Sequence, residues 1–276
     1  MPRSVALLAV FLLSAAQSAS AQPTLARLVE AVREKAKALE STSGMQLGFK
    51  TFTAANKLKP DQVSLSDFAV VRLLFESTRD AGLWNLHWKI TDLEPNSDNV
   101  WKQWGSARGA AAWSPSAPTA IAECDELSAL FAFLARRAGV RNVGLFWPYS
   151  NHTVAVWTVQ PKVRVVVPTT QIFLEEGDLF GTRRFDPWTQ KNIYEYTRRD
   201  APDTLVIPSS LFDFFLSQMD KYGGASDSTL QRLRYLRDAV FRKQLTRAQA
   251  ASAALAIVAG SPEDGAALRH FARDLK

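Results

Sequence analysis

The stretch from residue 124 to residue 167 constrains the fold most, because its apolar pattern changes from a helical repeat to strand-like runs. Large apolar residues recur at the helical period at Leu127, Leu130, Phe131 and Leu134. This period predicts a helix over 124–138, and Gly139 stands where a glycine commonly ends a helix. Strands are predicted next, over 140–147, 152–159 and 163–167. A helix followed by short antiparallel strands favours an α+β fold.

The first 21 residues have the pattern of a secretory signal peptide. Arg3 supplies the positive charge, residues 5–13 form an apolar run, and Ala19-Ser20-Ala21 meets the small-residue rule for cleavage after Ala21. An uncleaved anchor is the alternative, but nine apolar residues fall short of the about 20 that a spanning helix needs. We therefore expect a secreted or periplasmic protein that is not integral to a membrane.

The rest of the chain divides into three predicted segments. Residues 22–105 are expected to be helical and rich in tryptophan, with helices over 23–39 and from Ser64, and an irregular stretch over 41–60. Residues 106–203 hold a low-complexity linker, the helix and strands described above, and a long loop. Residues 204–276 are expected to form helices, over 210–222 and 227–243 and in a final pair that starts at Thr246 and Ser261.

Four tryptophans gather near the end of the first segment, at Trp84, Trp88, Trp101 and Trp104. Such a cluster can line a groove for a sugar or a peptide, or it can fill a core between a helix layer and a sheet. Core packing is the favoured interpretation, because large aromatic rings most often contribute buried area.

The ionisable residues exclude several classes of function. The formal net charge is +6, but the charges are interspersed, and no basic run with interleaved aromatics indicates nucleic-acid binding. The single cysteine, Cys124, cannot form an intramolecular disulfide, so it is a buried inert thiol, an intermolecular bridge or a working thiol. The histidines, at His87, His152 and His270, have no metal-ligand spacing with it. We expect no metal and no cofactor.

Cys124 and His152 are the candidate catalytic residues. Cys124 opens the predicted helix, where the positive end of the helix dipole favours the thiolate, so alkylation well below pH 8 is expected. His152 opens a predicted strand 28 residues later, and a helix start and a strand end can meet in such a fold. The alternative is a packing cysteine, because Cys124 shares a helix face with Leu127 and Phe131.

Residues 120–170 resemble the core of the transglutaminase-like superfamily. The motif residues are Ala122-Glu123-Cys124-Asp125-Glu126-Leu127-Ser128-Ala129-Leu130, the helix end Leu134-Ala135-Arg136-Arg137-Ala138-Gly139-Val140, and the strand Asn151-His152-Thr153-Val154-Ala155-Val156-Trp157. The resemblance implies a papain-like α+β arrangement with Cys124 as nucleophile and His152 as base. It also implies a cysteine peptidase, a hydrolase, or an amide-bond acyltransferase acting on peptides or proteins.

One motif position departs from the family, whose third strand usually ends in Asp-Pro-Thr. Val167 stands before Pro168-Thr169 and cannot accept a hydrogen bond. Thr169 and Gln171 are the nearest polar candidates to orient the imidazole. Trp113 is a candidate second donor for an oxyanion, beside the backbone N–H of Cys124, or else it anchors the linker. The missing Asp leaves a second hypothesis, a non-catalytic binding module of the same fold that recognises a protein or a polysaccharide.

Overall fold

The computed structural model describes residues 22–59, 61–94, 96–106, 118–149, 152–170, 186–195, 201–258 and 265–275. The predicted signal peptide, Trp113 and Gln171 lie outside these residues. The N-terminal helices are α1 (Leu25–Leu39), α2 (Ser43–Ala55), α3 (Leu65–Thr78) and α4 (Asp98–Ser106). The central elements are β1 (Leu86–Trp88), β2 (Ala120–Ala122), α5 (Cys124–Arg137), β3 (Val143–Tyr149), β4 (His152–Gln160) and β5 (Val163–Val167). The C-terminal helices are α6 (Ser209–Tyr222), α7 (Asp227–Phe241), α8 (Arg247–Val258) and α9 (Gly265–Asp274).

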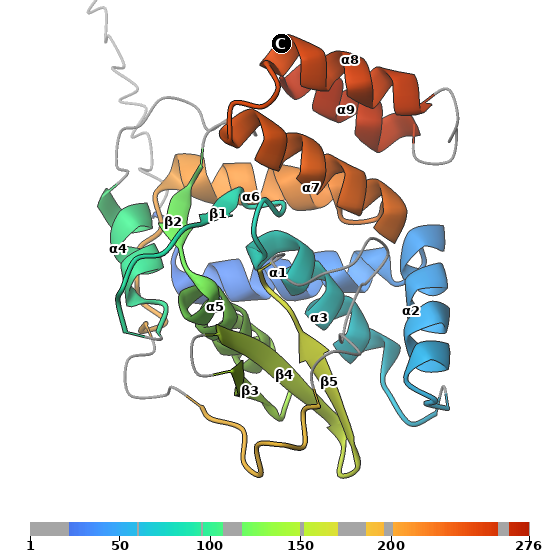
Figure 1. Ribbon diagram of the computed structural model, residues 1–276, viewed down its shortest axis with the longest axis vertical. Helices are drawn as coiled ribbons and strands as arrows, with labels where there is room; N and C mark the ends of the chain where they lie inside the picture. Colours follow the sequence, from blue (N-terminus) through green and yellow to red (C-terminus); the bar gives the residue numbers. More distant parts are fainter. Residues whose placement is uncertain are drawn as a thin grey trace, which may run out of the picture.

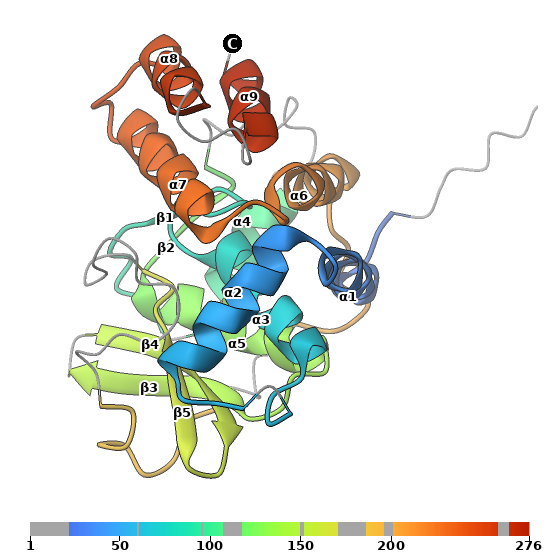
Figure 2. The same ribbon diagram turned by 90° about the vertical axis from the view of Figure 1, so that its right-hand side faces the viewer.

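Helix α5 packs across one face of an antiparallel sheet with the order β3-β4-β5 (Figures 1 and 2). The sheet register pairs Val143 with Trp157 and Ala155 with Val167. At the far end of α5, Gly139 takes a φ of 102°, a left-handed conformation that an L side chain rarely adopts. This glycine reverses the chain from the helix into β3, as its position in the sequence predicts.

The two faces of the sheet bury different side chains. Ala155 and Trp157 belong to the main apolar core, which they share with α5. Val154 and Val156 point the other way and form a small cluster with Phe146. The segment 186–195, gold in Figures 1 and 2, covers this second face, with Ile193 packed on the small cluster.

Helix α3 lies on the other side of α5 and contacts α1, so helices cover the sheet in successive layers (Figure 2). The tryptophans of the first segment are part of this interior. Trp84, Trp101 and Trp104 are buried, and Trp84 stacks on Phe215 of α6 at 4.4 Å between ring centroids. The core interpretation is confirmed for these three residues.

Helices α6–α9 gather at one end of the molecule, at the top of Figure 1. A buried ion pair joins this group to α3: both Nε and Nη2 of Arg72 contact Oδ1 of Asp227, at 2.8 and 2.7 Å. The same guanidinium donates to the carbonyl oxygens of Gly223 and Ala225. One apolar core therefore runs from α1 to α9, through all three predicted segments.

Most helix starts agree with the sequence predictions. Ser64 caps α3 by accepting the N–H groups of Ser66 and Asp67, and Thr246 and Gln249 form a reciprocal capping pair at α8. The prediction of an irregular stretch over 41–60 is wrong, because α2 occupies most of it. The mixture of helices and small sheets agrees with an α+β class. Among the described residues, none of the helices has both the length and the apolar character to cross a bilayer.

The ion pair between α3 and α7 yields the first prediction. Replacing Asp227 by Ala should lower the free energy of unfolding by about 3–5 kcal/mol, because it leaves the buried charge of Arg72 without its counter-ion. Denaturant unfolding followed by circular dichroism measures this change. Asp220→Ala is the matched control: Asp220 pairs with Lys35 at an exposed position, and its loss should cost less than about 1 kcal/mol. Equal losses in the two variants would contradict the prediction.

Candidate active site

The start of α5 is held by carboxylates that reach across to the segment after β1. The backbone N–H of Glu123 donates to Oε2 of Glu126 at 2.8 Å, which is one half of a capping box. Thr91 donates its backbone N–H to Glu123 and its hydroxyl to Glu126, each at 2.8 Å. These bonds place Cys124, the first residue of α5, at a firmly capped helix end.

The thiol of Cys124 lies between α5 and the start of β4. Its sulfur accepts hydrogen bonds from the backbone N–H groups of Thr153 and Asp125, which favour the thiolate. Burial outweighs them and raises the pKa of the Cys124 thiol, and the negative charges of Asp125 and Glu123 raise it further. The structure thus reverses the expectation of an acidic thiol, because the helix dipole acts here against desolvation and two carboxylates.

His152 begins β4, directly before the residue that contacts the sulfur. Its side chain is buried, and burial lowers the pKa of the imidazole to about 4. At neutral pH the ring is therefore neutral and can accept a proton. By the alternation of β4, His152 belongs to the same series as Val154 and Val156. The imidazole therefore belongs to the face of the sheet opposite the one that packs on α5.

A second polar contact ties α5 to the same end of the sheet. Ser128 of α5 donates its hydroxyl to the carbonyl oxygen of Thr153 at 3.3 Å. The Ser128 and Thr169 hydroxyls lie 2.8 Å apart. Since the single hydroxyl hydrogen of Ser128 goes to Thr153, Thr169 is the donor in this pair. Thr169 therefore positions α5 against β4 and β5, and only its acceptor lone pairs are left for an imidazole.

Val167, the residue before Pro168, is fully buried and pairs with Ala155 of β4. The structure therefore brings Cys124, the start of β4 and Thr169 to one end of the α5–sheet layer. The other two candidates, Trp113 and Gln171, lie outside the described residues.

Asp125 is a feature of the site that the sequence reasoning did not single out. Burial, followed by the charge of Glu123, raises the pKa of the Asp125 carboxyl to about 7. Its Oδ1 accepts the backbone N–H of Glu126 at 2.8 Å. An aspartate that titrates near neutrality, next to a thiol, can hold or release a proton there. The local signal was the acidic run around Cys124, in which Glu123, Asp125 and Glu126 crowd one helix end.

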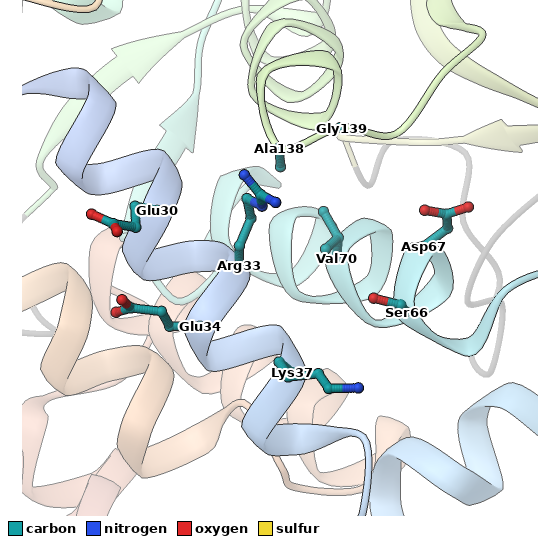
Figure 3. A pocket seen from close by; sticks show the side chains of 9 residues that line it. All are labelled: Glu30, Arg33, Glu34, Lys37, Ser66, Asp67, Val70, Ala138 and Gly139. Atoms are coloured by element: carbon teal, nitrogen blue, oxygen red, sulfur yellow. The ribbon is translucent and has the colours of Figure 1, made fainter.

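The described surface also has a groove of about 580 Å³ between α1 and α3. It lies at the opposite end of α5 from Cys124, beside Ala138 and Gly139, and charged side chains such as Arg33 and Asp67 line it (Figure 3). The groove is therefore separate from the thiol, and none of the predicted site residues lines it.

Comparisons with known proteins found no matching family model, no matching curated protein and no matching solved structure.

The charge of Asp125 yields the second prediction. Between about pH 6 and 8 this carboxyl loses its proton, and the new charge opposes thiolate formation next to it. The rate of Cys124 alkylation should therefore rise less steeply with pH than for an isolated thiol. In Asp125→Asn the rate at pH 8 should be roughly threefold higher or more, because a nearby negative charge is missing. Iodoacetamide labelling followed by mass spectrometry measures the rate.

Asp213→Asn, a change at an exposed position on α6, is the control and should label like the unchanged protein. A variant lacking the Asp125 charge that labels no faster than this control at pH 8 would show that the carboxyl does not influence the thiol.

Proposed function

We propose that this protein is an exported thiol enzyme of the transglutaminase-like type, in which Cys124 attacks an amide carbonyl of a peptide or protein. The observation that carries the proposal is the contact between the Cys124 sulfur and the backbone of Thr153. The contact supports the proposal because Thr153 directly follows His152 at the start of β4. The order helix, then three antiparallel strands, supports the same assignment.

At rest the proposed pair is a thiol and a neutral imidazole rather than an ion pair. Burial raises the thiol pKa and lowers the imidazole pKa to about 4, so both groups are in their uncharged forms at neutral pH. His152 would then act as a general base, which takes the thiol proton as the sulfur attacks. Cys124 and His152 would then act as a serine hydroxyl and its histidine base do, with a thiol in place of the hydroxyl.

The reaction proceeds in two balanced steps. The sulfur forms a bond to the carbonyl carbon, the carbon–nitrogen bond breaks, and His152 passes the proton to the leaving amine. Water or a second amine then attacks the thioester, gives its proton to His152 and releases the thiol. Hydrolysis makes the protein a cysteine peptidase, and amine attack makes it an acyltransferase.

The carboxylates around the thiol favour a basic group next to the scissile bond. Glu123 and Asp125 flank Cys124, and Glu126 is buried behind it. The negative charge of these carboxylates attracts an ammonium or guanidinium group to the start of α5. A lysine amine is also the acceptor that transfer would need, so the same feature serves either outcome.

A specific observation favours the binding module as the second candidate function. Val167 is fully buried where the family has its orienting Asp, and removing that carboxylate costs several orders of magnitude in serine-type triads. In this alternative the thiol is a packing residue, consistent with its raised pKa, and the protein recognises a protein or polysaccharide without turnover.

Substitution of Cys124 and His152 tests the proposed enzyme. Cys124→Ala and His152→Ala should each reduce peptide cleavage or amine incorporation by about a thousandfold or more, because the nucleophile and its base act as one unit. Release of a fluorescent group from lysine-rich peptides and uptake of a labelled amine measure the two outcomes.

His270→Ala is the matched control, a histidine on α9 remote from this corner, and it should keep the full rate. If Cys124→Ala retains the rate of the unchanged protein, the thiol mechanism is wrong. If the unchanged protein has no turnover with either assay, the binding module is the better account.

A further inference from the structure

Three side chains far apart in the sequence meet where α7 passes the turn after α3. One ligand-type atom each from Asp80, His87 and Asp238 can be chosen so that all three lie within 4.8 Å of one another. Asp80 lies in the turn after α3, His87 is the middle residue of β1, and Asp238 belongs to α7. Both views of the fold place α7 next to β1 (Figures 1 and 2).

Asp80 is held firmly by its backbone and by one carboxylate oxygen. Its N–H donates to the carbonyl oxygen of Thr169 at 2.8 Å, and its Oδ1 accepts the backbone N–H of Trp88 at 2.7 Å. The residue is 5% exposed. The Asp80 carboxylate is therefore held in one orientation, and lone pairs on both of its oxygens are left to bind a ligand.

His87 supplies the observation that points to a ligand. The residue is 2% exposed, and its ring stacks on Phe241 at 3.9 Å between centroids. Nε2 lies 3.0 Å from Oδ1 of Asn85. Because an amide oxygen only accepts, Nε2 carries the hydrogen and Nδ1 carries the lone pair. Nδ1 is 4.0 Å from Oδ1 of Asp80 and has no hydrogen-bond partner among the described residues.

This arrangement has the form of a metal-binding histidine with its supporting shell. Ligating imidazoles usually donate their other N–H to an oxygen, which selects the tautomer and holds the ring. The Asn85 oxygen does this for His87. A buried imidazole nitrogen with an unused lone pair costs free energy unless something binds it.

Asp238 completes the group from the solvent side. Its side chain is 25% exposed, which gives an ion a route in. Nε of Arg242 contacts both of its oxygens at 2.8 Å, in an i,i+4 pair on α7. Arg242 is itself 44% exposed, so it can move aside or share the carboxylate when a cation binds.

We propose that Asp80, His87 and Asp238 form a binding site for a divalent transition-metal ion of the zinc class. One imidazole nitrogen and two carboxylate oxygens are a donor set that Zn²⁺ accepts, with a fourth position left for water. Zinc holds its ligands at about 2.0–2.2 Å. The three atoms would therefore close on the ion by roughly half an ångström or more, which side-chain rotation of Asp238 and Asp80 can supply.

The ion would join α7 to the turn after α3 and to β1. Asp80 and His87 belong to the N-terminal part of the core, and Asp238 belongs to the C-terminal helices. A ligand that binds only the folded state stabilises it in proportion to the logarithm of its concentration. The site is therefore expected to strengthen the docking of α7, independently of any chemistry at Cys124.

Zinc binding to the chelator-treated protein tests this proposal. Equilibrium dialysis with Zn²⁺ followed by elemental analysis should find one ion per chain, and Zn²⁺ should raise the midpoint of thermal unfolding. Asp238→Asn keeps the side-chain shape but loses the charged ligand, so it should weaken binding by about tenfold or more. Asp80→Asn is a second variant at an independent ligand, and circular dichroism verifies that each variant is folded.

His270→Ala and Cys124→Ala are the matched controls, and both should bind Zn²⁺ like the unchanged protein. Cobalt(II) distinguishes the sites further, because a thiolate ligand produces a charge-transfer band in the near ultraviolet. Failure of the unchanged protein to bind one equivalent of Zn²⁺ would overturn the proposal. So would undiminished binding in the two Asp variants, or a thiolate band that vanishes in Cys124→Ala, which would place the ion at the thiol.

Discussion

The structure depends on the charges that α3 carries into the interior. Arg72, Glu76 and Arg79 are each less than 4% exposed on a helix that is buried along nearly all its length. Glu76 and Arg79 pair with each other at 2.6 Å, and Arg72 pairs with Asp227 of α7. A buried charge without a partner costs several kcal/mol. The C-terminal helices therefore stabilise the burial of α3.

Elements with a local signal could be predicted from the sequence, whereas an element whose fit depends on contacts with distant segments could not. Helix α5 and the strands after it have local signals, a helical period, a terminal glycine and short apolar runs, and all of these elements form. Helix α2 has the opposite local signal, because glycine and threonine are poor helix formers. A Cβ on Gly44 would lie 2.5 Å from the carbonyl oxygen of Gly224. The glycine is needed because α2 packs directly on the turn before α7, which no local pattern reveals.

The same division applies to the candidate active site. The sequence predicts that Cys124 begins a helix and that His152 begins a strand, and both residues have these positions in the structure. The protonation of the thiol does not, because it depends on how deeply α5 is buried and on the carboxylates of Glu123 and Asp125. The dipole of a helix end favours a thiolate by only a small margin, so burial determines the sign. The group of Asp80, His87 and Asp238 is still less predictable, since its third member is contributed by α7.

A path of buried hydrogen bonds joins the proposed metal site to the candidate active site. The atoms in that path show how a change at one site can leave the other in place. The Asp80 N–H donates to the carbonyl of Thr169, whose hydroxyl contacts Ser128. Ser128 donates to the carbonyl of Thr153, whose N–H contacts the sulfur of Cys124. At Asp80 this path uses only the backbone, whereas the proposed metal site uses only the side chain. A cation can therefore draw the Asp80 carboxylate inward without breaking a bond that positions the thiol.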